Sequence, residues 1–275
     1  MSYEIIKYNA RLWIKLGDRL LAGYTTNELR SYLFPLYTPS GALVLQESPP
    51  DHPHHQGVWC GLEVNGHDLW NAGSFAKPRH RQICDTSLYD LTTLVTTSGV
   101  QLKHLVRWVT VDGEELLWEQ RELLIGATYD CTFVRWRSTF FHPQAPTHFG
   151  QTKESGIAIR VPPHFESPFV GRIRNRQGGI GEAETFDQLS PWVNVEGSSG
   201  GKHVAGIVLA PTNESETCPW FTRDYGIHVY NPARHRPFDL APGVKMTWAV
   251  NVLAYDGTRT EEEIDALVTS CGMSD

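Results

Sequence analysis

The sequence predicts an all-β protein, a large antiparallel β-sandwich with a short C-terminal helix. Three observations carry this prediction. Short runs rich in β-branched and aromatic residues recur between Gly, Pro, Asn and Asp, helical periodicity is nearly absent before residue 260, and "VDGEE" at 111–115 contains an Asp-Gly hairpin signal. Many strands at hairpin spacing are typical of a sandwich.

Eight segments carry the strand signal most clearly. They are Glu4–Tyr8, Leu12–Leu16, Leu102–Val109, Leu116–Leu124, Tyr129–Phe140, Val204–Ala210, Gly226–Tyr230 and Lys245–Tyr255. In the last segment alternate residues from Met246 to Ala254 are apolar and share one face, while Asn251 lies on the other. In the fifth, Arg135 and Arg137 alternate with apolar residues, so one face is basic.

The C-terminal segment "TEEEIDALVTSCG" has the signals of a helix. Thr260 is the expected N-cap, Glu263 its capping-box partner, and Gly272 the stop. The glycine-rich loops at 177–181 and 197–201 interrupt the pattern, but strands resume after each, and we find no repeat or low-complexity linker. We therefore expect one domain over residues 1–275. "QGGIG" at 177–181 lacks the lysine and the strong helix of a phosphate-binding loop, so a surface loop is expected there.

Composition limits the partners. The net charge of −7 and the lack of a basic stripe argue against nucleic acid. The five cysteines include no Cys-x-x-Cys pair, which favours reduced thiols in a cytoplasmic protein. No apolar run is long enough for a membrane span, so we expect no membrane partner, and the composition allows a homo-oligomer.

The segment "DHPHHQGVWCGLEVNGHDLW" at 51–70 concentrates candidate chemistry. Neutral imidazole is the commonest metal ligand, so His52, His54 and His55, joined by His148 or Glu154, allow a divalent metal, although the spacing matches no closed metal motif. The same histidines suit hydrogen bonding and proton transfer on a polar ligand. A third interpretation is a turn in which the histidines are structural.

Two further segments carry polar groups. In "HFGQTKESGIAIRV" at 148–161, Lys153 and Glu154 precede a strand, where they are either an electrophile and a base or a surface ion pair. In "CPWFTRDYGIHVYNPARHRPF" at 218–238, Arg223, Asp224 and Tyr225 suit recognition of hydroxyls or a carboxylate, or an Arg–Asp pair that holds a loop. Motifs of serine or cysteine nucleophiles are absent.

These segments occur in the order "DHPHHQGVW", "VNGHDLW", "FGQTKESGIAIRV", "GRIRNRQGG", "PWVNVEG" and "RDYGIHVYNP", which resembles the PmoA-like family of bacterial domains. The resemblance covers about Tyr32 to Tyr255 and implies a β-sandwich with a carbohydrate or sugar-acid ligand. Because the sequence has no spanning segment, the membrane-bound methane oxidation in the family's name is not carried over. The chain departs from the family at Gln56, where arginine is common, and at Phe221, where histidine is common.

The resemblance supports a set of site residues. They are His54, His55, Gly57, Trp59, Asn65, Gly66, Trp70, Lys153, Glu154, Arg223, Tyr225 and Asn231. The leading hypothesis is a carbohydrate-active enzyme, a lyase, epimerase or hydrolase that acts by proton transfer. A sugar epimerase of the galactose-mutarotase kind, with its supersandwich fold, would use the same groups.

The predicted roles follow from that hypothesis. The catalytic candidates are His54, His55, Lys153 and Glu154. The substrate-binding candidates are Trp59, Asn65, Trp70, His148, Arg223, Asp224, Tyr225 and Asn231. The alternative is a non-catalytic protein that binds or senses a sugar, and the third hypothesis is a metal-dependent oxygenase or hydrolase.

Overall fold

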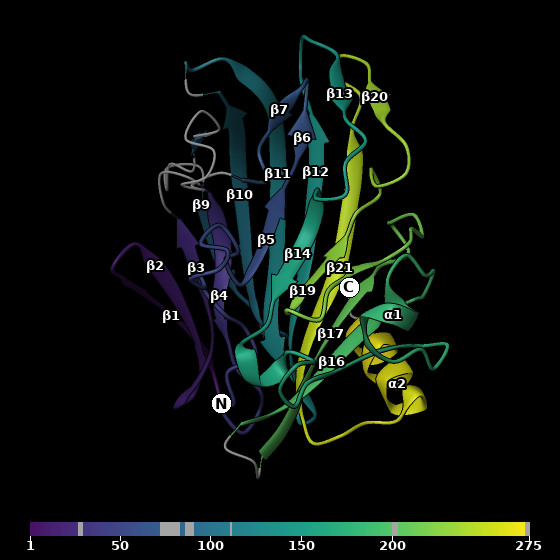
Figure 1. The fold of residues 1–275 in the computed structure, drawn as a ribbon. Coiled ribbons are helices and arrows are strands. Elements are labelled where there is room, and N and C mark those ends of the chain that lie inside the picture. The colour runs from purple at the N-terminus through teal and green to yellow at the C-terminus, as the bar shows by residue number, and fades with distance from the viewer. Residues whose placement is uncertain (27–29, 72–82, 86–90, 111, 200–202, 273–275) are drawn as a thin grey trace.

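Two large antiparallel sheets pack face to face in the computed structural model (Figure 1). The structure describes all residues except 27–29, 72–82, 86–90, 111, 200–202 and 273–275. No described helix is long and apolar enough to cross a bilayer.

One sheet has eight strands in the order β1-β2-β3-β4-β5-β14-β19-β18. Their bounds are β1 Tyr3–Tyr8, β2 Arg11–Leu16, β3 Arg19–Thr26, β4 Ser31–Leu36, β5 Val58–Gly61, β14 Gly156–Arg160, β19 Ile227–Tyr230 and β18 Phe221–Thr222. The strand β14 lies between β5 and β19, so it joins the segment of the histidines to the segment of Arg223.

The other sheet has nine strands, eight of them in the order β15-β16-β17-β21-β12-β11-β10-β8, with β9 paired to β10. Their bounds are β15 Arg172–Asn175, β16 Val193–Ser199, β17 His203–Pro211, β21 Met246–Asp256, β12 Cys131–Phe141, β11 Glu115–Ala127, β10 Val100–Val109, β8 Ile83–Asp85 and β9 Leu91–Val95. The long strands β10, β11, β12 and β21 form its centre.

A small four-stranded sheet and three short helices complete the described fold. The small sheet has the order β20-β13-β6-β7, with bounds β20 Phe238–Leu240, β13 Thr147–Phe149, β6 Glu63–Val64 and β7 His67–Asp68. The helices are the 3₁₀ helix η3 Pro163–Phe165, α1 Gly181–Thr185 and α2 Glu261–Gly272.

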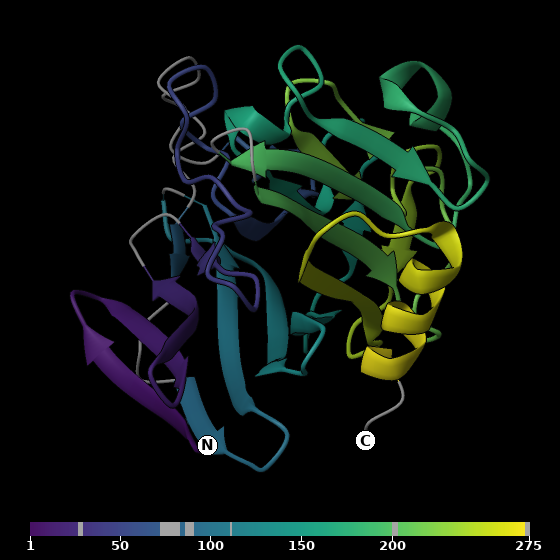
Figure 2. The same cartoon turned by 90° about the horizontal axis from the view of Figure 1, so that it is seen from below.

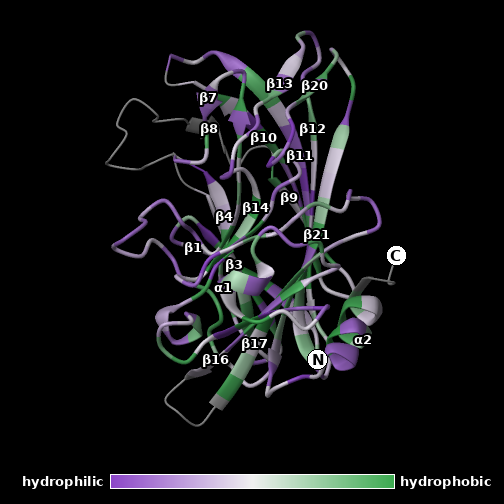
Figure 3. Ribbon diagram, turned by 45° about the vertical axis from the view of Figure 1, so that its right-hand side comes forward, coloured by the Kyte–Doolittle hydropathy of each residue, from purple (hydrophilic) through white to green (hydrophobic). Residues whose placement is uncertain are grey.

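The main core lies between the two large sheets. Strand alternation sends Val250 and Val252 of β21 and Ile157 and Ile159 of β14 into this core. A second apolar cluster lies on the outer face of the nine-stranded sheet, where Ile264 and its neighbours in α2 pack on β17 and β21 (Figure 2). The hydropathy colouring shows hydrophobic stretches along β17 and β21 and hydrophilic residues in many connecting loops (Figure 3).

The all-β prediction is confirmed, and each of the eight expected segments lies largely within a strand. The β10–β11 hairpin closes at the Asp-Gly signal. The capping box of α2 is also confirmed, because the Thr260 amide donates to Glu263 Oε2 at 2.8 Å and the Glu263 amide donates to Thr260 Oγ1 at 3.3 Å. The four cysteines with described side chains are buried and form no disulfide with one another, and they are Cys60, Cys131, Cys218 and Cys271.

Several elements were not predicted, each for a physical reason. The strand β4 contains Pro35, which cannot donate to a ladder and weakens the strand signal. The strand β5 is a short buried run without alternation, which periodicity cannot detect. After the "QGGIG" loop the chain forms the five-residue helix α1, too short to give a helical period.

A buried ion pair crosses the core. Glu119 and Arg121 of β11 are 0% and 1% exposed, and the Arg121 guanidinium donates to both carboxylate oxygens of Glu119 at 2.8 Å. Arg121 also donates to the carbonyl and the hydroxyl oxygen of Ser31 in β4, at 2.9 and 2.7 Å. Glu119 accepts from Trp108 Nε1 at 3.0 Å and from the hydroxyl of Ser138. The pair thus links strands of both large sheets.

We expect Glu119→Gln to lower the free energy of unfolding by about 3 kcal/mol, because it leaves the buried guanidinium without its counter-charge. Glu122→Gln on the same strand is the control. Glu122 pairs with Lys103 and Arg137 near solvent, so its loss should cost less than about 1 kcal/mol. Urea unfolding of both variants measures the difference. Equal stabilities would contradict the assignment of Glu119–Arg121 as the ion pair that links the two sheets.

Candidate functional site

The loop that carries the histidines is held in a tight turn between β4 and β5. The amide of His52 donates to the carbonyl of Pro49 at 3.1 Å, and the amide of His55 donates to that of His52 at 2.9 Å. Gly57 ends the loop at φ +63°, and a Cβ there would lie 2.1 Å from the carbonyl oxygen of Leu33. Only glycine therefore lets the loop lie this close to β4.

Four flat side chains form a continuous stack from this loop, which we call the ring stack. It runs Tyr225–His52–His55–Trp59, with centroid distances of 5.0, 4.6 and 5.2 Å and interplanar angles of 1°, 10° and 24°. Trp70 packs beside the inner end, 5.3 Å from Trp59. The stack stands on the outer face of the eight-stranded sheet, because Trp59 lies on the opposite face of β5 from Val58, a residue of the main core.

Burial divides the histidines. His54 and His55 are 8% and 2% exposed, whereas the side chain of His52 is 35% exposed. Burial, together with the nearby His54, His52 and Arg160, holds the pKa of His55 far below its ordinary value, so His55 is neutral throughout the physiological range. The expected roles of His54 and His55 in proton transfer stay predictions, and burial favours a positioning role for His55.

Arg160, at the end of β14, organises the polar side of the ring stack. Its side chain is 2% exposed, and its Nη2 lies 3.1 Å from Asp51 Oδ2 and 3.1 Å from Glu166 Oε1. Its Nη1 donates to His55 Nδ1 at 3.4 Å, and its Cζ lies 5.3 Å from the ring centroid of Tyr225. One buried guanidinium thus holds two carboxylates beside the stack.

The two carboxylates have opposite pKa shifts. Burial raises the pKa of Glu166, and the charge of Asp51 adds to this while Arg160 opposes it. Burial acts on Asp51 in the same direction, but the hydrogen bond from His52 and the charge of Arg160 outweigh it and lower its pKa. Neighbouring carboxyl groups with diverging pKa values are the usual arrangement for an acid and a base.

Lys153 and Glu154 lie at the solvent side of the site. They form an ion pair at 3.5 Å, in which the Lys153 side chain is 71% exposed and that of Glu154 30%. Burial raises the pKa of Tyr225, and the charge of Glu154 adds to the increase, so Glu154 lies close to the outer end of the ring stack. The charge of Glu154 thus acts on Tyr225 at the outer end of the ring stack, while Lys153 extends into solvent.

Arg223 and Asp224 approach the stack from the β18–β19 loop. Arg223 Nη1 pairs with Glu182 Oε1 at 2.6 Å, and its Cζ lies 5.9 Å from the ring centroid of Tyr225. Asp224 accepts from the Glu182 amide at 3.1 Å through Oδ1, and its own amide donates to Glu182 Oε2 at 2.9 Å. Arg223 borders the site, and Asp224 has the structural role of holding α1 to the loop.

Three predicted residues have contacts elsewhere. Asn65 forms the β6–β7 turn at φ +51°, and its Oδ1 accepts from the amide of His148 at 2.8 Å. His148 is exposed and pairs with Asp239 at 2.7 Å in the small sheet. Asn231 is buried, and its Nδ2 donates to the carbonyl of Thr152 at 2.9 Å. Within the described part of the chain, these hydrogen bonds and ion pairs do not join the three residues to the ring stack.

The two positions that depart from the PmoA-like pattern are both buried. Gln56, 8% exposed, follows the histidines, and its side-chain oxygen has no hydrogen-bond partner among the described residues. Phe221 packs beside Phe186 at 5.7 Å, with the guanidinium groups of Arg223 and Arg234 over its ring. Both side chains serve as packing next to the site.

A divalent metal was one expectation for the histidine segment. Among the residues that the structure describes, no group of three or more His, Cys, Asp or Glu side chains is placed to hold a metal ion. His52 and His55 present their ring faces to each other, 4.6 Å apart, which is stacking geometry and directs their nitrogens away from a shared ion.

Sequence reasoning missed Arg160, Asp51 and Glu166 as site residues. A signal for Arg160 was present, because Ile157 and Ile159 face the core, and the even-numbered position 160 must then lie on the outer face. Glu166 lies six positions after Arg160, and the turn at η3 brings it back to the guanidinium, but no motif in this short segment predicts the contact.

A model of the family described as "Family of unknown function (DUF6807)" matches residues 11–269, so the chain belongs to this family. No curated protein matches it. A solved structure of a beta-arabinopyranosidase has a TM-score of 0.42 at 13% identity. The alignment covers 86% of this chain and 38% of the arabinopyranosidase chain. A 4-alpha-glucanotransferase from Thermococcus litoralis has a TM-score of 0.39 at 10% identity, with 93% and 40% covered. This chain spans less than half the length of either protein, and such scores carry no argument about function.

Another buried histidine, His228, gives a pH-dependent prediction. Burial, with a contribution from Arg160, lowers the pKa of His228 to about 3, and neither ring nitrogen has a hydrogen-bond partner among the described residues. As the pH falls from about 6.5 towards 3, the unfolded chain binds a proton that the folded protein does not, so stability falls.

His228→Gln should reduce the slope of the unfolding free energy against pH by about 1.4 kcal/mol per pH unit between pH 4 and 6. Urea unfolding at a series of pH values measures the slope. Measurements above pH 7, where His228 is neutral in both states, isolate the packing effect of the substitution. An unchanged slope below pH 6 would show that the folded protein protonates His228 as readily as the unfolded chain does.

Proposed function

We propose that this member of the DUF6807 family binds a carbohydrate beside the ring stack and acts on it by proton transfer, as a lyase, epimerase or hydrolase. The observation that carries the proposal is the pair of carboxylates, Asp51 and Glu166, held 3.1 Å from one buried guanidinium nitrogen of Arg160. Their pKa values shift in opposite directions, which supports a division of roles between a proton donor and a proton acceptor.

The mouth of the site suits a polyhydroxylated ligand. The faces of the stacked rings largely contact each other and Arg160, so the solvent side presents ring edges and polar groups. These groups are the carboxylates of Asp51 and Glu154, the ring of His52 and the guanidinium of Arg223, each at least 30% exposed in its side chain. Alternating acceptors and donors on a rigid base match the hydroxyl pattern of a sugar.

Each group has a role in the proposed chemistry. Glu166, with its raised pKa, is the proton donor, and Asp51, with its lowered pKa, is the acceptor. Arg160 holds both and stabilises negative charge that develops on the substrate. His55 is neutral and accepts from Arg160, so it fixes the guanidinium against the stack, while Glu154 binds hydroxyl groups.

The resemblance to the PmoA-like family remains part of the proposal. We infer that the two descriptions concern one family, because the matched residues 11–269 include the whole segment from Tyr32 to Tyr255. A sugar-binding or sensing protein without turnover is the alternative function, since the same groups can bind hydroxyls without transferring protons.

Glu166→Gln and Asp51→Asn should each reduce turnover by about 100-fold or more, because each removes one partner in proton transfer. The assay follows glycosides, 3-keto-glycosides and free aldoses in deuterated water by NMR, so that both conversion and solvent exchange are observed. The wild-type rate should decline as the pH rises above the raised pKa of Glu166 and as it falls below the lowered pKa of Asp51.

Asp239→Asn is the matched control, since Asp239 is an exposed carboxylate paired with His148 in the small sheet. It should retain wild-type turnover. Sugar binding without conversion or exchange in the wild type would favour the sensing alternative. Full activity of Glu166→Gln and Asp51→Asn would rule out the carboxylate pair as the acid and base.

A further inference from the structure

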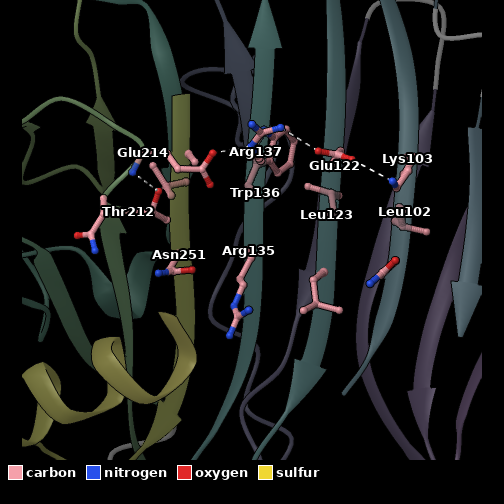
Figure 4. Close-up of a pocket in the computed structure, with 15 residues that line it drawn as sticks. Leu102, Lys103, Glu122, Leu123, Arg135, Trp136, Arg137, Thr212, Glu214 and Asn251 are labelled. Carbon is pink, nitrogen blue, oxygen red and sulfur yellow. Dashed lines mark hydrogen bonds and ion pairs between the residues drawn. The ribbon is translucent and has the colours of Figure 1, made fainter. Parts of the chain in front are cut away.

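A groove lies on the outer face of the nine-stranded sheet, on the other side of the core from the ring stack. It crosses β10, β11, β12 and β21, has a volume of about 480 Å³, and is bordered on one side by Thr212–Glu214 after β17 (Figure 4). This volume is within the range of small-molecule sites. It shares no lining residue with the proposed carbohydrate site.

The strand register determines the floor of the groove. Asn251 is paired with Arg135, Arg135 with Leu124, and Leu124 with Gln101, so these four side chains form one row across four strands. They all lie on the outer face, because their chain neighbours such as Val250 and Val134 belong to the main core. The floor therefore offers a guanidinium, two amides and one aliphatic side chain.

A chain of ion pairs forms one rim. Lys103 Nζ lies 3.2 Å from Glu122 Oε1, Arg137 Nη1 lies 3.0 Å from Glu122 Oε2, and Arg137 Nε lies 2.8 Å from Glu214 Oε2. Figure 4 shows this chain running above Arg135 and Asn251. The lining has three cationic and two anionic side chains, so it is net positive in a chain of net charge −7. A net positive lining favours an anionic ligand.

The buried amide of Asn251 points to a ligand. Asn251 is 2% exposed, and its Oδ1 is buried without a hydrogen-bond partner among the described residues. Leaving such an acceptor unmet destabilises the folded protein. Packing does not require an amide here, because the next outward positions on β21, Leu253 and Tyr255, belong to an apolar cluster. A ligand hydroxyl that donates to Oδ1 would offset this cost.

We propose that this groove is a second ligand site, which binds a small carboxylic acid that also carries hydroxyl groups. Arg135 binds the carboxylate, since a guanidinium matches its two oxygens. Asn251 Oδ1 accepts a hydrogen from an adjacent hydroxyl, and Gln101 and Thr212 contact hydroxyls further along the groove. The carboxylate and the hydroxyl are both required, because the floor places a cation and an unmet acceptor on neighbouring strands.

Isothermal titration calorimetry with D-gluconate tests the site, with acetate and D-glucose as probes that carry only the carboxylate or only the hydroxyls. Gluconate should bind at least about tenfold more tightly than acetate, and glucose should show no binding that depends on Arg135. Asn251→Leu and Arg135→Gln should each weaken gluconate binding by about tenfold or more. Asn251→Leu should also fold with at least wild-type thermal stability, because it removes an unmet polar group.

Two controls separate this site from the carbohydrate site. Gln120→Ala changes the same face of β11 outside the groove, and Glu166→Gln changes the ring-stack site, so both should keep wild-type gluconate affinity. The proposal is overturned if the wild type binds gluconate no better than acetate. It is also overturned if Asn251→Leu and Arg135→Gln, shown to be folded by thermal unfolding, bind gluconate as the wild type does.

Discussion

The buried pair of Glu119 and Arg121 is the constraint on which the sandwich depends. A charge inside an apolar core is tolerated only with a counter-charge and a full set of hydrogen bonds. Here the counter-charge lies on the same strand, β11, and the hydrogen-bond partners come from both sheets. Arg121 reaches Ser31 on β4, while Glu119 is bound by Trp108 on β10 and Ser138 on β12. Sliding one sheet over the other would break several of these bonds at once. The pair therefore fixes the relative position of the two sheets, and with it the strands that carry both sites.

The candidate site has a similar arrangement nearer the surface, in which a buried arginine pairs with carboxylates. Arg160 is as buried as Arg121, but its two carboxylate partners, Asp51 and Glu166, differ in exposure, at 48% and 12% of their side chains. The Glu119–Arg121 pair is closed on all sides, so its only role is structural. The Arg160 cluster has one open carboxylate at the solvent boundary and a neutral His55 behind it. A buried cation can therefore serve stability in one place and chemistry in the other, depending on which partner reaches solvent.

The sequence predicted the strands that alternate clearly, and it singled out the loop that carries the histidines. It placed His54, His55, Trp59 and Tyr225 in the site, and the structure brings them together in or beside the ring stack. It did not predict the cluster around Arg160, because two of its members, Arg160 and Asp51, are more than 100 positions apart in the chain. Asn65 and His148 were grouped with the histidines from the sequence motifs, but they lie in a separate small sheet. Local patterns report elements and turns, whereas convergence of distant side chains depends on strand order.

Strand order also explains how the two proposed ligand sites can coexist in this fold. A sandwich has two outer faces, and here the ring stack stands on one and the groove of Asn251 on the other, with the whole core between them. Residues without shared partners affect stability and binding additively. Occupancy of the groove can influence the ring stack only by changing how the sheets pack. The Glu119–Arg121 ion pair resists such a change, because it is hydrogen-bonded to both sheets. The two sites should therefore bind their ligands independently, each as a property of its own sheet.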